Sequence, residues 1–286
     1  MKNRTVNRRK VRLTFSSVAF FKKDYAASAA IALKKGWGQI GTEPYRPFIP
    51  VHRFAGCGFS VRLCCPRTGE SIHCHSLGEA NWGRILLWQE GHVQLFSQVA
   101  IPRQDSMRIA AKLGIKHPVY PDKTMAVMTT DFVHLSLVGG VRTFTAYSIK
   151  PSPQAIKQRK AQLLAIEKQY YRELGINWVL KFKHDADQKV LANIRFVEGF
   201  VGQSPLIWGS DRWNLFEPGI YAEVSLGLPL NRACQNAQKK LQMPRNTALT
   251  LVRFFIANRI WHIDWAILIN TSAPLDVLRR SPELKL

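Results

Sequence analysis

The sequence predicts an α/β protein with a mixed central sheet, followed by a smaller C-terminal domain. Segments with strand and helix patterns alternate through the first part of the 286 residues. Gly139 and Gly140 separate two strand-like segments and have the chemistry of a tight hairpin turn. Near the end of the chain a helix, a turn, a second helix and a strand follow one another, which is the order of a winged helix.

The elements before the hairpin are predicted from apolar patterning and turn residues. Ser76 and Glu79 have the spacing of a capping box, so we expect a helix to begin there and to run to about Gln89. The other elements expected in this part are a helix at 22–34, strands at 53–65, 71–75 and 93–101, and a short helix at 106–113.

The hairpin and the segments after it complete the predicted order. The hairpin strands are expected at 126–138 and 141–150, followed by a long charged helix at 153–174, which Gly175 ends, and a strand at 177–183. A polar segment at 184–192 is expected to join the second domain, which has helices at 230–242 and 248–258 and a strand at 260–268.

Charge is the unusual feature of the composition. Lysine and arginine number 41 and aspartate and glutamate 19, so the net charge is +22. Such a surplus favours a polyanionic partner, first of all nucleic acid. An anionic membrane is the second interpretation, but no apolar run of about 18 residues is present to span a bilayer. The basic N-terminus lacks a convincing signal-peptide cleavage site, so we expect a basic arm and a cytoplasmic protein.

A group of cysteines and histidines raises the question of a zinc site. Their spacing contains no C-x2-C pair, and two of the cysteines are adjacent, which points their side chains to opposite faces of a strand. We therefore favour reduced cysteines over zinc ligands. The residues concerned are Cys57, Cys64, Cys65, Cys74, His73 and His75.

The hairpin brings a carboxylate and a lysine together. If Gly139 and Gly140 are the two turn residues, Val138 pairs with Val141, and Asp131 then lies opposite Ser148. Residues two apart share a face of the sheet, so Asp131, Ser148 and Lys150 are expected to project from the same side. A change of one residue in the turn would reverse this arrangement.

Asp131 and Lys150 at this spacing are typical of metal-dependent nucleases. The carboxylate holds a hard cation, and the lysine orients a water or neutralises charge. Glu79, from a helix packed on the sheet, supplies a second carboxylate. Each residue also has a structural interpretation: Glu79 as the capping-box partner of Ser76, and Asp131 with Lys150 as a cross-strand ion pair.

Several short motifs in one order resemble the TnsA endonucleases of heteromeric transposons. The order and spacing agree over roughly residues 36–183, and the C-terminal part resembles the family more loosely. The motifs are Ser76-Leu77-Gly78-Glu79, Leu113-Gly114-Ile115-Lys116-His117-Pro118, Met128-Thr129-Thr130-Asp131-Phe132, Ser148-Ile149-Lys150-Pro151 and Gly175-Ile176-Asn177-Trp178.

The resemblance implies a restriction-endonuclease-like catalytic domain at 36–186, between a basic arm at 1–35 and a winged-helix domain at 187–286. It implies that Glu79, Asp131 and the backbone carbonyl of Ile149 bind magnesium or manganese, and that Lys150 is the catalytic lysine. Ser148 stands where better-known members have Gln or Glu, which puts its direct coordination in doubt.

The resemblance also implies an activity and partners. The family nicks the 5′ ends of the element, the non-transferred strands, while a separate TnsB-like transposase joins the 3′ ends. A TnsC-like ATPase regulator is linked to the C-terminal domain, and some relatives serve CRISPR-associated transposons. A chain that ends near Ala186 is therefore expected to bind the regulator more weakly and to keep its metal site folded.

Basic residues outside the site are candidates for contacts with double-stranded DNA. Those in the N-terminal arm and after the catalytic lysine would follow phosphates, whereas those of the C-terminal helices would contact DNA only if this domain does not dock a protein instead. The candidates are Arg8, Arg9, Lys10, Lys116, Lys157, Arg159, Lys160, Arg245 and Arg253. His117 is expected to be structural.

Two other functions remain open from the sequence. One is a winged-helix DNA-binding protein without catalysis, and the other is a restriction or repair nuclease of the same fold. Convergence of Glu79, Asp131 and Lys150 would disfavour the first, and only the partners separate the second from a transposition nuclease.

Overall fold

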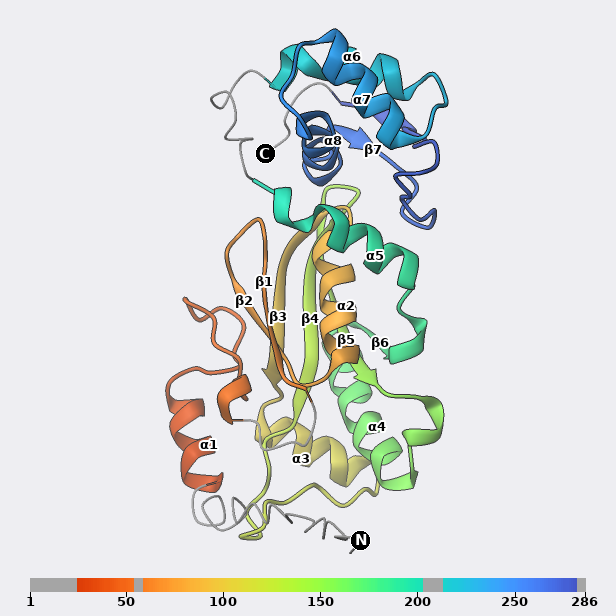
Figure 1. Cartoon of the computed structure of the whole chain (residues 1–286). Coiled ribbons are helices and arrows are strands. Elements are labelled where there is room, and N and C mark those ends of the chain that lie inside the picture. The colour runs from red at the N-terminus through yellow and green to blue at the C-terminus, as the bar shows by residue number, and fades with distance from the viewer. Residues whose placement is uncertain (1–24, 54–58, 203–212, 282–286) are drawn as a thin grey trace, which may run out of the picture.

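A mixed four-stranded sheet forms the centre of the molecule (Figure 1). The computed structural model describes residues 25–53, 59–202 and 213–281. The strand order is β3 (His92–Ala100), β4 (Thr129–Val138), β5 (Val141–Lys150) and β6 (Asn177–Phe182). β4 runs antiparallel to both β3 and β5, and β6 lies parallel to β5. The α/β class with a mixed central sheet is thus confirmed.

Helices cover both faces of this sheet. α2 (Leu77–Trp88) packs on one face, where Phe132 and Ile149 enter its apolar core. α4 (Gln158–Glu173) crosses between β5 and β6, and its Tyr171 packs with Val133 and other residues of the opposite face. The alternation of side chains along each strand therefore supplies two separate apolar layers. α3 (Arg103–Lys112) lies against α4.

A second, smaller sheet lies beside β3. It is the hairpin of β1 (Val61–Cys64) and β2 (Ser71–Cys74), which leads directly into α2. The N-terminal segment, with α1 (Tyr25–Lys34) and a short 3-10 helix at Val51–Arg53, lies near this hairpin and the lower end of the sheet in Figure 1.

The C-terminal part packs directly on the part of the chain that contains the central sheet rather than standing apart from it. Its helices are α5 (Gln188–Val197), α6 (Trp213–Val224), α7 (Leu230–Lys240) and α8 (Thr247–Ala257). They share one continuous apolar cluster with α2, in which Trp88 packs against Trp265 at a ring distance of 5.3 Å. A two-residue pair, β7 (Trp261–His262) with β8 (Arg279–Arg280), completes this part.

Several predicted elements differ from the structure. Within the described residues, the strand expected at 53–65 is limited to Val61–Cys64. The strand expected at 260–268 is limited to Trp261–His262, because the Asp264 side chain accepts a hydrogen bond from the backbone of Ala266 and turns the chain. The long helix begins at Gln158, after a 3-10 turn at Pro153–Ala155. The segment read as a polar connection runs into α5, whose Leu191, Ile194 and Val197 are buried at helical spacing.

The hairpin has the expected register. Val138 pairs with Val141, and the pairing continues to Phe132 with Tyr147. The next position along this ladder places Asp131 opposite Ser148. Gly139 and Gly140 both have positive φ, at 58° and 81°, as a type I′ turn requires.

Four of the five cysteines lie within the described residues. Cys64, Cys65, Cys74 and Cys234 are free thiols, and Cys57 lies outside the described residues. In the described ranges, no group of three or more His, Cys, Asp or Glu side chains is arranged to hold a metal. No helix in the same ranges is long and apolar enough to cross a bilayer.

Candidate active site

Asp131 and Lys150 meet at the open end of the β4–β5 hairpin, near the first residues of β4 and the last residue of β5. The lysine Nζ donates to Asp131 Oδ2 at 2.8 Å and to the carbonyl oxygen of Ile149 at 3.0 Å. The backbone N–H of Ile149 donates to the same Asp131 oxygen at 2.7 Å. The hairpin register therefore places two donors, the Lys150 ammonium and the Ile149 N–H, around one carboxylate oxygen of Asp131.

The charge of Lys150 is held in place by its acidic neighbours. Its side chain is 18% exposed and that of Asp131 is 15% exposed, so neither charge is well solvated. Burial alone would lower the pKa of Lys150, but the charge and hydrogen bond of Asp131, with the charges of Glu167 and Glu79, outweigh it and raise the pKa. Lys150 is therefore a permanent cation in this arrangement.

Glu79 approaches the same place from the first turn of α2. Its backbone N–H donates to the Ser76 hydroxyl at 3.1 Å, so Ser76 caps the helix as expected. The Glu79 carboxylate accepts hydrogen bonds from the backbone of His75 at 2.8 Å and from the Ser76 hydroxyl at 3.0 Å. These contacts fix the orientation of a carboxylate that is only 7% exposed.

Glu79 and Asp131 repel one another. Burial raises the pKa of Glu79 to about 7, and the negative charge of Asp131 is the second cause of this rise. The repulsion between two poorly solvated carboxylates is relieved by a proton or by a cation, and carboxylate and carbonyl oxygens are ligands that Mg²⁺ and Mn²⁺ prefer. The donor set of Glu79, Asp131 and the Ile149 carbonyl therefore fits a hard divalent cation.

Ser148 makes a different contact from the one that the spacing predicts. Its hydroxyl donates to Glu167 Oε1 of α4 at 2.6 Å, and the side chain is 1% exposed. Burial, followed by the charge of Asp131, raises the pKa of Glu167. Ser148 thus holds a third buried carboxylate near the site. Glu167 was not singled out from the sequence, because one Glu within a charged helix carries no distinguishing signal.

Gln98 is a further residue that sequence reasoning missed. The β3–β4 register pairs Ser97 with Phe132 and Val99 with Thr130, which puts Gln98 opposite Asp131. Its amide contacts Glu79 Oε2 at 3.4 Å and the Thr129 hydroxyl at 3.3 Å. Its φ of 53° is unusual for a residue other than Gly, and such strain is concentrated at functional sites. The available signal was a polar pair, Ser97-Gln98, within an apolar strand.

The candidate DNA contacts divide into three groups. Lys116, Lys157, Arg159, Lys160 and Arg245 are exposed, as a phosphate contact requires. Arg253 is half-buried and its guanidinium lies 4.2 Å from the ring centre of Phe196, so the structure argues against its expected DNA contact. Arg8, Arg9 and Lys10 lie outside the described residues.

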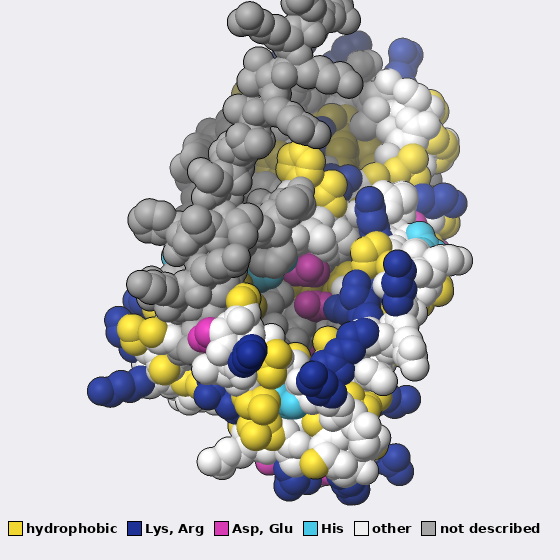
Figure 2. Space-filling view, turned by 90° about the horizontal axis from the view of Figure 1, so that it is seen from below, with side chains coloured by type: hydrophobic (Ala, Val, Ile, Leu, Met, Phe, Trp, Pro, Cys, Tyr) yellow, Lys and Arg dark blue, Asp and Glu magenta, His cyan; other side chains and the backbone are white. Residues whose placement is uncertain are grey.

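The lower end of the molecule presents acidic side chains in a hollow, with Lys and Arg side chains beside them (Figure 2). Charges of both signs thus lie side by side on this face. A polyanion attracted by the basic side chains would reach the acidic ones only with a cation to neutralise them.

The mixed sheet, with this site at the ends of its two central strands, fits a restriction-endonuclease-like fold. Over 165 residues the chain is 28% identical to TnsA, a transposition protein of transposon Tn7 from Escherichia coli. The match covers 58% of this chain and 60% of TnsA, so it spans less than two thirds of that relative. The resemblance to TnsA seen in the sequence motifs is thereby confirmed. No protein-family model matches the chain.

Proposed function

We propose that this protein is a metal-dependent DNA endonuclease that cuts the 5′, non-transferred strands at the ends of a transposon. The observation that carries the proposal is the meeting of Asp131, Lys150 and Glu79 at one end of the sheet. The relationship to a transposition protein and the net charge of +22 support the choice of DNA as the substrate.

The chain's own residues have separate roles in this proposal. Glu79, Asp131 and the Ile149 carbonyl would hold Mg²⁺ or Mn²⁺, which supplies Lewis-acid polarisation of a phosphodiester and a more acidic water. Lys150 stays protonated and neutralises the charge that builds up on the phosphate. Ser148 of β5 and Glu167 of α4 would support this region through their mutual hydrogen bond rather than by direct contact to the metal, and Gln98 would orient Glu79.

The exposed basic residues would follow the DNA backbone. Lys157, Arg159 and Lys160 begin α4 soon after Lys150 in the chain, and Lys116 lies in the loop after α3. We infer that they place the duplex so that one phosphate reaches the carboxylates. The partners we propose are a TnsB-like transposase, which acts at the 3′ ends, and a TnsC-like ATPase regulator.

We also propose that the C-terminal part is a winged-helix domain that docks a partner protein. α7, α8 and the β7–β8 pair have the required order, with Asn246 in the left-handed conformation at φ 66° between the two helices. Docking is favoured over DNA reading because Arg253 of α8 packs inward on Phe196. Arg245 remains exposed and available to DNA.

The test is a strand-specific cleavage assay. The full chain is mixed with the cognate 3′-end transposase, the ATPase, ATP and plasmid that carries the transposon ends, and products are resolved on denaturing gels. We expect Mg²⁺-dependent cuts at the 5′ strands, which Asp131→Ala abolishes while DNA binding persists. Asp105→Ala is the matched control and keeps the cuts, because this carboxylate is 42% exposed and pairs with Arg108 on α3, outside the proposed site.

Three outcomes decide between the functions. Cleavage that survives in Asp131→Ala refutes the site. Efficient cutting of any duplex by the chain alone, without transposase, indicates a restriction or repair nuclease instead. DNA binding without any cutting under all divalent ions leaves a DNA-binding protein without catalysis.

A further inference from the structure

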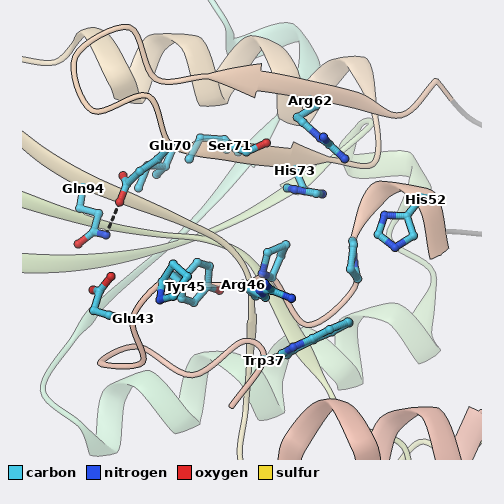
Figure 3. Close-up of a pocket in the computed structure, with 15 residues that line it drawn as sticks. Trp37, Glu43, Tyr45, Arg46, His52, Arg62, Glu70, Ser71, His73 and Gln94 are labelled. Atoms are coloured by element: carbon cyan, nitrogen blue, oxygen red, sulfur yellow. Dashed lines mark hydrogen bonds between the residues drawn. The ribbon is translucent and has the colours of Figure 1, made fainter. Parts of the chain in front are cut away.

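A pocket of about 380 Å³ lies beside the proposed active site, between the N-terminal loop and the β1–β2 hairpin (Figure 3). This volume lies within the usual range of small-molecule sites, roughly 300–1,000 Å³. Trp37 and Arg46 line the pocket from the loop, and Arg62 and His73 line it from the hairpin. None of the residues proposed for metal binding lines it, so the pocket is a separate site.

Cations gather at one end of the pocket. Arg62 lies directly opposite His73 in the β1–β2 ladder, and Figure 3 shows His52 close to both. Arg46 also lines the pocket, and in the part of the chain that the structure describes neither arginine forms an ion pair. Two guanidinium groups without a carboxylate partner favour an anion, and guanidinium matches phosphate geometry best.

His73 adds a directed hydrogen-bond donor. It is 7% exposed, and its Nδ1 accepts the backbone N–H of Val51 at 3.0 Å, which places the proton on Nε2. Burial, followed by the charge of Arg62, lowers the pKa of His73 to about 4, so the ring is neutral at pH 7. Across the described ranges, no hydrogen bond joins its Nε2 to a protein group. Because His73 lines the pocket, a ligand there can supply an acceptor for this donor.

Acceptors gather at the other end. Glu70 precedes His73 by three residues on an extended strand, so the two ends lie about 10 Å apart. Glu70 accepts the side-chain amide of Gln94 at 2.7 Å, and Glu43 lies on the same side in Figure 3. Tyr45 and Arg46 lie between the two ends in Figure 3, and the ring of Trp37 lines the pocket below them. Phosphate contacts, an aromatic surface and carboxylate acceptors for an amino group are the features that one nucleotide requires.

The pocket is also connected to the proposed active site. The backbone N–H of His73 donates to the Ser97 hydroxyl at 3.0 Å, and Ser97 precedes Gln98, which contacts Glu79. His75, two residues after His73, donates its backbone N–H to Glu79. The β2 strand and the residues that follow it therefore link the wall of the pocket to Glu79.

We propose that this pocket takes one unpaired nucleotide of the DNA substrate, with its phosphate at Arg62 and His73 and an amino-bearing base at Glu70. The inference rests on the proposed DNA substrate. Such a pocket favours distorted or opened DNA over a regular duplex, because a nucleotide must leave the stack to enter it. Adenine, cytosine and guanine fit the acceptor end, whereas thymine lacks an amino group.

The test compares two fluorescein-labelled duplexes that differ by one bulged dA, with binding followed by anisotropy in EDTA so that no cleavage occurs. We expect the wild-type chain to prefer the bulged duplex about tenfold, in the range of one stacked base. Arg62→Glu should remove this preference. Arg67 is an exposed residue of the same hairpin and lies outside the pocket. Arg67→Glu should therefore weaken the binding of both duplexes equally and keep the preference for the bulged one.

Further binding measurements distinguish a DNA nucleotide from a free nucleotide or phosphate, and the pocket proposal from the nuclease proposal. A bulged dT should give a smaller preference than dA. Free dAMP and inorganic phosphate are titrated alone: tight binding of dAMP without any preference for bulged DNA would overturn the assignment to a DNA nucleotide. A preference that survives in Arg62→Glu, with an unchanged melting temperature, would also overturn it. Asp131→Ala should keep the preference for bulged DNA. A failure of the nuclease proposal is therefore seen in the cleavage assay, whereas a failure of the pocket proposal is seen in the binding preference.

Discussion

Single side chains in this protein are positioned by backbone hydrogen bonds. Asp131 is fixed by the N–H of Ile149, and Glu79 by the N–H of His75, so neither carboxylate depends on a flexible partner for its orientation. The cost is electrostatic, because both are poorly solvated and raise each other's energy. Lys150 offsets part of that cost, and a divalent cation would offset the rest.

The raised pKa of Glu79 gives a prediction about stability and pH. Its pKa rises from 4.5 to about 7 on folding, mainly through burial. The folded state therefore holds this proton more tightly, and the associated stability, up to about 3 kcal/mol, is present below pH 4.5 and is lost as the pH rises to about 7. In EDTA, Glu79→Gln should be more stable than the wild type at pH 8 and similar at pH 4.5.

This prediction is checked by denaturant unfolding at the two pH values. Adding Mg²⁺ at pH 8 should stabilise the wild type and leave Glu79→Gln nearly unchanged, because the cation replaces the missing proton. An equal response of both proteins to Mg²⁺ would show that Glu79 does not hold the metal.

At the scale of elements, the pairing of the central strands sets the geometry of the site. The β4–β5 turn fixes Asp131 against Lys150, and the β3–β4 pairing places Gln98 opposite Asp131. The β3–β4 pairing begins at Gly91, whose carbonyl accepts the N–H of Leu137 at 2.7 Å. A slip of one residue in either ladder would move these side chains to the other face.

Gly91 therefore offers a test of the sheet. Its φ is 74°, and a Cβ atom there would lie 2.2 Å from the carbonyl oxygen of Leu137. We expect Gly91→Ala to destabilise the protein by several kcal/mol and to lower cleavage through the altered register. Gly175→Ala is the matched control, because Gly175 has a similar φ of 68° with nothing within 4 Å, and should cost only about 1 kcal/mol. If thermal unfolding shows the same decrease in melting temperature for the two variants, the close contact at Gly91 is contradicted.

The whole molecule is held together by a core that crosses the predicted boundary at residue 186. Leu191 and Phe255 from the C-terminal helices share one apolar cluster with Leu86 of α2. Polar contacts cross it too: Arg84 pairs with Glu198 at 3.2 Å, and Arg259 donates to the Trp88 carbonyl. The domain boundary itself stays a prediction, but the two parts stabilise one another.

This shared core changes the expectation for a shortened chain. A chain that ends at residue 186 exposes the apolar side of α2, so we expect a melting temperature at least several degrees lower and a weaker metal response. A chain that ends at residue 281 serves as the control and should melt like the full chain. An unchanged melting temperature for the shorter chain would show that the catalytic part folds independently, as the sequence alone suggested.

The sequence by itself determined the local parts of this protein. Two glycines with positive φ set the hairpin register, and from that register the contact between Asp131 and Lys150 followed by counting. The capped start of α2 also followed from Ser76 and its spacing to Glu79. These features depend on neighbours close in the chain, where turn geometry and strand periodicity leave few alternatives.

Only the tertiary structure decided the rest. The bond from Ser148 to Glu167, the place of Gln98 beside Glu79 and the inward turn of Arg253 join residues from separate elements. So does the pocket between the N-terminal loop and the β1–β2 hairpin. The packing of helices on a sheet brings these groups together, and side-chain spacing within one element carries no information about which other element will cover it.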